Sequence, residues 1–257
     1  TRKLDDHTIG KERQVSLNVI TQEHKNHGAE NILAAQGTGK HELLMVLPED
    51  ARLMTEIIVH IKTQKYIQQN TGGGLDASMS SILAQRGRQN TERRSKLKSL
   101  CEGLMSKAKF FLNGALIEGL GEGDPRNRFS KAAQQLISFS FPNLRMLKVV
   151  YGEESLKKAL LDPDDLLTGG AQNLSEAEQE ILTYIQRNQN DGERTSVEEM
   201  IRNFEKPPYG WYTLAVTTLI ARLFRMGKIE LRNPDLLDAQ KSYDNIKNPR
   251  LHGALRV

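Results

Sequence analysis

Four residues near the start of the chain are of the types that bind phosphate. Gly37-Thr38-Gly39-Lys40 brings glycines and a lysine together, as a phosphate-binding loop does. Such a loop also needs a glycine five residues before its Gly-Lys pair and a Ser or Thr after the lysine, but Ala34 and His41 stand there. We expect strands at residues 31–36 and 42–47 on either side, whereas a phosphate loop leads from a strand into a helix N-terminus. The sequence therefore predicts no nucleotide site here.

Metal ligands are equally sparse. His24 and His27 have i, i+3 spacing, but no third ligand is recognisable and Gly28 indicates a surface turn. Asp162, Asp164 and Asp165 lie in a Pro-containing turn, where carboxylates commonly cap the next helix. We predict no metal site and no cofactor for this chain.

A basic segment is the first candidate for binding. Between residues 85 and 109 there are eight basic and two acidic residues, and apolar positions at helical spacing predict one long helix, broken near Gly87. Its polar face would carry the candidate contacts Arg86, Arg88, Arg93, Arg94, Lys96 and Lys98. Such a face can bind nucleic acid or an acidic protein, or be merely solvated. All three alternatives remain open.

The second candidate is a winged helix-turn-helix at residues 174–232. Two capping boxes, Ser175 with Glu178 and Thr195 with Glu198, predict two short helices. After the turn at residues 206–210, apolar residues at helical spacing predict a third helix from near Trp211, and Gly227 suits its C-terminal cap. Residues 229–232 alternate as a strand would, and residues 254–257 resemble another.

The charge of this domain does not favour DNA strongly. It has eight basic and nine acidic residues, whereas a DNA-binding domain usually has a clear basic face. The contacts available to DNA or a protein would be those on the predicted polar face of the third helix and just after it: Thr217, Thr218, Arg222, Arg225 and Lys228. A packing or protein-contact role competes with a DNA-contact role.

The fold class expected is α/β plus mostly helical, with a small mixed sheet and helices followed by the winged helix. Besides the two strands near Lys40, we expect a helix at residues 50–68 that buries Ile58 and Ile61, a hairpin around Asn113-Gly114, and a helix after Pro125 that buries Ile137. Gly72-Gly73-Gly74 indicates a loop. The expected division is a poorly defined segment at 1–30, an α/β domain at 31–150, a helix and linker at 151–173, the winged helix at 174–232 and a tail at 233–257.

Composition limits the class of protein. The 257 residues are 38% hydrophobic and 26% charged, which is typical of a soluble chain, and no apolar run approaches the length of a membrane span. Cys101 is the single cysteine and reads as a small buried apolar residue. A lone cysteine favours a reducing, cytoplasmic location. Because the chain begins at Thr1, we expect it to be a piece of a longer protein.

Several segments resemble one family. They are FEKPPYGWYTLAVTTLIARLFRMGKIELR (204–232), LMVLPEDARLMTEIIVHIKTQKYIQQN (44–70), AKFFLNGALIE (108–118) and LDDHTIGKE (4–12). Together they are similar to the large P-loop proteins of bacterial BREX phage-defence systems, called BrxC, or PglY in the phage-growth-limitation relatives. The resemblance covers most of residues 44–257 and rests chiefly on the Pro208-Tyr209-Gly210-Trp211 turn and the strand end at Val46-Leu47-Pro48.

The resemblance implies a much longer parent with an ATPase domain that binds ATP and Mg²⁺. The P-loop itself is absent from this sequence. We therefore expect a non-catalytic assembly or DNA-contact portion of a BREX-type ATPase, with other BREX proteins as partners, weak DNA binding and oligomerisation as further options. The alternative is a free-standing winged-helix transcription regulator. An enzyme is the third reading, for which no convergent polar cluster is evident.

Overall fold

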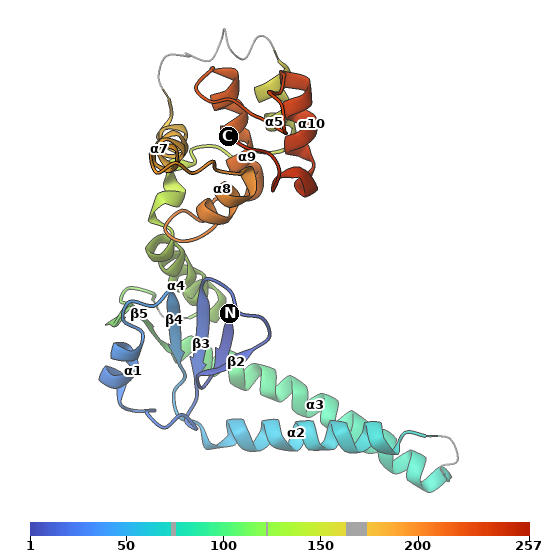
Figure 1. The fold of residues 1–257 in the computed structure, drawn as a ribbon. Helices are drawn as coiled ribbons and strands as arrows, with labels where there is room; N and C mark the ends of the chain where they lie inside the picture. Colours follow the sequence, from blue (N-terminus) through green and yellow to red (C-terminus); the bar gives the residue numbers. More distant parts are fainter. Residues whose placement is uncertain (73–75, 122, 163–173) are drawn as a thin grey trace. The chain divides into compact units, whose positions relative to one another are not determined.

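The computed structural model describes residues 1–72, 76–121, 123–162 and 174–257 (Figure 1). The chain divides into two compact units, residues 1–137 and 138–257. Gly73 and Gly74 of the expected loop at residues 72–74 lie outside the described residues. So does most of the expected linker at 162–173. Among the described helices, none is both long and apolar enough to cross a membrane.

The first unit contains a mixed six-stranded sheet in the order β2-β1-β3-β4-β5-β6. Its strands are β1 (Arg2–Leu4), β2 (His7–Ile9), β3 (Ser16–Ile20), β4 (Glu42–Val46), β5 (Lys109–Leu112) and β6 (Ala115–Leu116). β3 is parallel to β1 and β4, and the other pairs are antiparallel. The small mixed sheet expected from the sequence is present, with Asn113 and Gly114 at positive φ in the β5–β6 turn.

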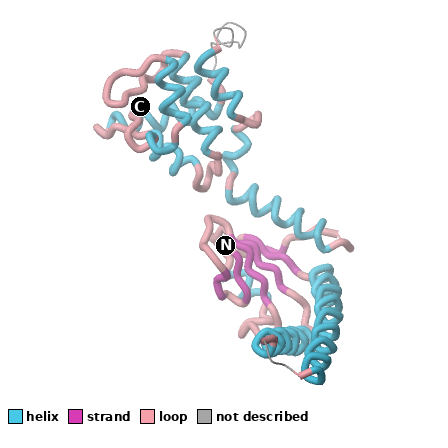
Figure 2. Tube along the Cα trace, turned by 90° about the vertical axis from the view of Figure 1, so that its right-hand side faces the viewer, coloured by secondary structure: helices cyan, strands magenta, loops and turns pink. Residues whose placement is uncertain are grey.

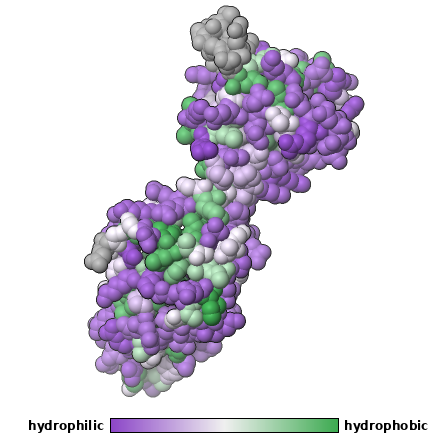
Figure 3. Space-filling model, turned by 90° about the vertical axis from the view of Figure 1, so that its left-hand side faces the viewer, coloured by the Kyte–Doolittle hydropathy of each residue, from purple (hydrophilic) through white to green (hydrophobic). Residues whose placement is uncertain are grey.

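Both faces of this sheet are covered, which explains why all five residues of β4 are buried. Leu44 lies on one face, in a cluster with Ile20 of β3 and Leu33 of helix α1 (Glu30–Gln36). Leu43 and Met45 lie on the other face and pack with helices α2 (Ala51–Asn70), α3 (Ala77–Lys107) and α4 (Pro125–Ser140). The face of this unit drawn in Figure 3 carries a group of apolar side chains surrounded by polar ones.

One expectation at the start of the chain is wrong, and the segment left undefined at 1–30 is folded. Residues 31–36 form helix α1 rather than a strand, because α1 is the crossover that joins parallel strands β3 and β4. Three strands from the segment set apart at 1–30 belong to the sheet. Their turn is held by Asp5, whose carboxylate accepts hydrogen bonds from the backbone N–H and the Oγ1 hydroxyl of Thr21, both at 2.7 Å.

Helices α2 and α3 form a long antiparallel hairpin, called the arm below, and they lie side by side in Figures 1 and 2. Asp50 caps α2, and α3 continues through Gly87 without the expected break. Ile58 and Ile61 were expected to be buried but are 45% and 57% exposed, because only one side of α2 packs on α3. Ile137 of α4 is likewise exposed rather than buried.

The second unit is helical. Its elements are η1 (Pro142–Met146), α5 (Glu153–Leu161), α7 (Glu176–Asn190), α8 (Val197–Phe204), α9 (Thr213–Arg225), α10 (Ala239–Lys247) and η2 (Pro249–Leu251). Side chains from α5, α7, α8, α9 and α10 share one hydrophobic core. The capping box of α7 is Ser175 with Glu178, as predicted, but that of α8 is Ser196 with Glu199, one residue later than predicted.

The wing differs from the expected pair of strands. Residues 229–232 and 254–257 contain isolated bridges only, in which Arg256 pairs with both Ser196 and Arg232. Ile229 and Leu231 are buried while Glu230 and Arg232 are exposed, so the expected alternation of side chains is present. Residues 233–257, expected to be a tail, are part of the domain. They contain α10 and η2, and Arg256 near their end forms a bridge with Arg232.

Candidate functional site

An aromatic cluster holds the turn that precedes α9. Trp211 is completely buried, and its ring stacks on Phe204 with centroids 4.8 Å apart and an interplanar angle of 8°. Tyr209 meets both rings edge-on, and the Trp211 indole Nε1–H donates a hydrogen bond of 3.1 Å to the Asn143 carbonyl oxygen. The turn therefore fixes where the third helix begins, two residues after Trp211.

α9 is the helix that would read DNA in a winged helix-turn-helix. Eight of its 13 residues are buried, and all the others are half-buried. Thr217 and Thr218, expected on a polar outer face, are only 2% and 1% exposed, and the Thr217 hydroxyl donates a 3.0 Å hydrogen bond to the Thr213 carbonyl oxygen. The expected polar face is wrong because α5 and α10, which lie outside the predicted domain, pack on α9 together with α7 and α8.

The first arginine of α9 is paired within the fold. The Arg222 Nε lies 2.7 Å from Glu178 Oε1, and the Glu178 side chain is only 2% exposed. The other oxygen of that carboxylate accepts hydrogen bonds from the N–H and the hydroxyl of Ser175 at the start of α7. Arg222 therefore neutralises a buried carboxylate. Arg225 is half-buried, which leaves Lys228 as the exposed cation of this candidate set.

Lys228 is positioned by the end of α9. Gly227 has φ +66°, its N–H donates to the Phe224 carbonyl, and the Lys228 N–H donates to the Leu223 carbonyl. These two bonds form the glycine-capped helix end expected from the sequence. Lys228 lines a groove of about 1040 Å³ beside the wing.

The same groove contains Arg232 and two further cations that the sequence analysis did not select, Arg194 and Arg256. They come from distant segments that only the bridges at Ser196, Arg232 and Arg256 bring together. Glu193 and Glu230 also line the groove, and the Glu230 carboxylate lies 2.7 Å from the Arg232 guanidinium. The groove is therefore mixed in charge.

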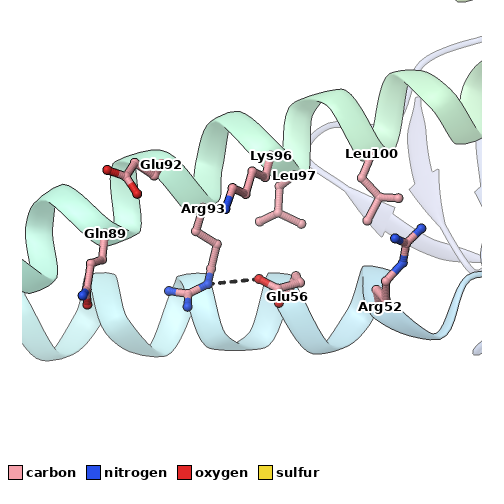
Figure 4. Close-up of a pocket in the computed structure, with 8 residues that line it drawn as sticks. All are labelled: Arg52, Glu56, Gln89, Glu92, Arg93, Lys96, Leu97 and Leu100. Carbon is pink, nitrogen blue, oxygen red and sulfur yellow. Dashed lines mark hydrogen bonds and ion pairs between the residues drawn. The ribbon is translucent and has the colours of Figure 1, made fainter.

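The basic residues of the arm are mostly exposed but do not share one face. At about 100° per residue, Arg88 lies on the side of α3 away from the hairpin seam, and Arg94 and Lys98 follow one flank. Arg93 and Lys96 follow the other flank, where they line a groove of about 520 Å³ between α2 and α3 (Figure 4). The expected single basic face is therefore wrong, because the cations surround the helix.

Within that groove, ion pairs occupy two of the three cations. The Arg93 Nε lies 3.0 Å from Glu56 Oε2 across the hairpin (Figure 4). Arg52 is bound to Asp50 through two side-chain hydrogen bonds of 3.0 and 2.6 Å, and these lower the pKa of Asp50 to about 2. Among the described residues, Lys96 is the groove cation with no ion pair.

The turn at Gly37-Thr38-Gly39-Lys40 runs from helix α1 into strand β4. This is the reverse of a phosphate loop, so no helix N-terminus points at the turn. Its Gly39 N–H donates a 2.9 Å hydrogen bond to the Asn113 Oδ1 of the β5–β6 turn. The turn therefore joins two parts of the sheet.

The two histidines considered as ligands lie in a turn rather than on a helix. His24 is buried, and its Nε2 lies 2.9 Å from Asp6 Oδ2, while the His27 ring bonds to the Leu47 carbonyl at 2.9 Å. The hydrogen bond from His24, with help from Asn18, lowers the pKa of Asp6. No group of three metal-ligating side chains occurs among the described residues. Cys101 is half-buried, and burial raises the pKa of its thiol.

Comparison with known proteins identifies both units. A family model described as "BREX ATP-binding protein BrxC 4th domain with six-stranded beta sheet" matches residues 1–136, and its six strands agree in number with the sheet found here. A second, described as "BREX ATP-binding protein BrxC winged helix-turn-helix domain", matches residues 146–246. No solved structure matches the chain. The first match alone covers more than half of the sequence, and the chain belongs to the BrxC family of BREX ATP-binding proteins.

Proposed function

We propose that this chain is a non-catalytic assembly portion of a BREX ATPase, in which the winged helix serves protein packing and protein contact rather than DNA reading. ATP and Mg²⁺ would bind elsewhere in the parent protein, in the cytoplasm, and the partners would be other BREX proteins or further copies of the parent. The burial of α9 is the observation that carries the proposal.

A recognition helix acts by placing side chains against base edges in the major groove. Thr217 and Thr218 lie in the core and cannot reach a base without displacement of α5 or α10. Arg222 is held by Glu178 at 2.7 Å, and releasing it would leave a buried carboxylate unpaired. Removing the counter-charge of a buried carboxylate is unfavourable, and DNA binding would have to offset that cost.

The construction of the wing supports the same conclusion. The connection between Arg232 and Arg256 contains α10, in which Ser242 and Ile246 are buried in the domain. The region that follows the third helix is therefore part of the core. The free-standing regulator, our alternative, would need an exposed recognition face in addition to a basic domain, and residues 174–232 offer neither.

Two charge reversals test the proposal in the intact parent protein. Arg225→Glu with Lys228→Glu alters the end of α9, and Arg222 is left unchanged because a glutamate there would face the buried Glu178. Arg94→Glu with Lys98→Glu is the matched pair on the arm. Binding to fluorescent duplex DNA and co-purification of the other BREX proteins would both be measured.

We expect the α9 pair to leave DNA binding unchanged within about twofold. Any DNA binding should be sequence-tolerant and steeply dependent on salt, since it would rest on phosphate contacts. If the α9 pair instead abolishes sequence-specific binding while the arm pair leaves it intact, α9 is a recognition helix and the regulator reading replaces ours.

A further inference from the structure

The arm is a two-helix coiled coil. The residues of α3 that are buried against α2 are Leu83, Asn90, Leu97 and Leu104, which are spaced by seven. Such a repeat keeps one seam of a helix facing its partner along its length. α2 contributes Leu53 and His60 at the same spacing.

One layer of this seam is polar. Asn90 is 2% exposed, its Oδ1 lies 3.0 Å from His60 Nδ1, and its Nδ2 donates to the His60 carbonyl oxygen at 3.2 Å. A polar layer fixes the register of paired helices at a cost in stability. Beyond Asn90 toward the loop, Leu83 is the single buried apolar residue among those described. The outer part of the arm therefore has a small core of its own.

α2 has a second apolar surface that faces solvent. Ile58, Val59, Ile61 and Tyr66 are all exposed large apolar side chains. Met54, Ile58 and Ile61 are separated by four and three residues, the spacing by which one helix packs on another. At about 100° per residue, Ile61 and Ile58 lie about 100° and 160° around α2 from the seam residue His60. α2 therefore offers one face to α3 and a second face for another helix.

The second face has basic borders. By helical rotation, Arg94 and Lys98 of α3 lie on the flank away from the groove that Arg93 and Lys96 line. α2 adds Lys62 and Lys65, which are close to Ile58 and Ile61 in the sequence. Residues 50–107 contain ten basic and five acidic residues, a balance of +5, whereas the whole chain has a net charge of +4. The positive charge of the chain is thus concentrated on the arm.

We propose that the surface formed by Met54, Ile58 and Ile61 with Arg94 and Lys98 binds an acidic amphipathic helix of a partner protein, which completes a three-helix bundle with α2 and α3. The apolar row would pack against leucine-like side chains, and the cations would pair with carboxylates on either side of them. Nucleic acid would use the cations and gain nothing from Ile58 and Ile61. The proposal concerns the arm alone and stands whether or not the winged helix contacts DNA.

A designed peptide provides the probe. It has three heptads, with leucine at positions a and d and glutamate at e and g, and carries fluorescein for anisotropy measurements against the whole chain. A second peptide replaces the leucines by serine, a third replaces the glutamates by lysine, and a 21-base-pair duplex DNA is the fourth probe. We expect the first peptide alone among the three peptides to bind saturably.

The variants separate the two parts of the surface. Ile58→Ser with Ile61→Ser should weaken binding of the acidic leucine peptide at least tenfold, and Arg94→Glu with Lys98→Glu should do the same. Ile82→Ser with Lys96→Glu is the matched control, because Ile82 is also an exposed isoleucine and both lie away from the proposed surface. The control should change binding less than twofold. All these positions are at least partly exposed, and circular dichroism would verify folding.

The proposal is overturned if the acidic leucine peptide does not bind, if the serine peptide binds equally well, or if the isoleucine pair has no more effect than the control. Binding of duplex DNA that depends on Arg94 and Lys98, with no peptide binding, would assign the surface to nucleic acid instead. In the intact parent, a photocrosslinker at Ile61 should react with an acidic helical segment of a BREX protein. A crosslink to nucleic acid there would contradict the proposal.

Discussion

Replacing Trp211 by alanine should lower the free energy of unfolding of the second unit by about 4 kcal/mol. Truncating a large buried aromatic side chain typically costs about 3–5 kcal/mol. That range already includes the stacked contact with Phe204, for which about 0.5–1.5 kcal/mol is typical, and the hydrogen bond from the indole N–H to Asn143, for which roughly 1 kcal/mol is typical. We expect a value in the middle of the range, because the aromatic cluster should collapse partly into the space that the indole leaves.

Urea denaturation followed by circular dichroism at 222 nm measures this change. Fluorescence cannot be used, because Trp211 is the single tryptophan of the chain. Val150→Ala is the control, since Val150 is 90% exposed and its truncation should cost less than about 0.5 kcal/mol. Trp211→Phe should fall between the two. An unchanged midpoint for Trp211→Ala would refute the packing described here and make Trp211 a candidate contact for a partner.

Three further outcomes are expected. Magnesium-ATP should show no saturable binding to this chain in calorimetry. Micromolar binding that Lys40→Ala removes would show that the turn at residues 37–40 binds nucleotide despite its direction. Burial, together with the hydrogen bond to Glu180, raises the pKa of Tyr209 to about 12. The stability that the neutral phenol contributes is therefore complete below pH 10 and is lost as the pH rises toward 12. Tyr209→Phe should flatten the pH dependence of the unfolding free energy in that window, and an unchanged slope would contradict the raised pKa. Gly210→Ala should destabilise the second unit by more than about 1 kcal/mol, because Gly210 has φ +65° and a Cβ there would lie 2.5 Å from Phe141 Cδ1. Gly192→Ala, at φ +78° with open space around it, is the control for backbone strain alone. Equal losses of stability would show that the clash with Phe141 is unimportant.

The sequence predicted best those features that depend on neighbouring residues. The capping box at Ser175, the glycine cap after α9, and the hairpin at Asn113-Gly114 are local arrangements of side chains and backbone, and all three are present. The strand at Glu42–Val46 was also predictable, because a run of apolar residues this short fits a strand buried on both faces.

Features that depend on distant segments were mistaken or missed. Thr217 and Thr218 were placed on a polar face because their own helix gives no indication that α5 and α10 cover them. Residues 31–36 were read as a strand because a short apolar run lacks a reliable period, and only the parallel pairing of β3 and β4 requires a helix there. Arg194 and Arg256 could not be grouped from the sequence, since a bridge between remote segments places them in one groove.

The fold of the second unit and the charge of the chain point to two different surfaces for nucleic acid, α9 and the arm. A winged helix suggests DNA, but fold alone does not determine function. Here the helix that would read bases is the centre of the hydrophobic core, and its Arg222 compensates a buried carboxylate. The excess positive charge lies instead on α2 and α3, where some of the cations border an exposed apolar row. Cations alone would suit a phosphate backbone, whereas cations that border an apolar row suit an acidic helix better. On both units, the arrangement of side chains therefore supports the protein partners that we propose.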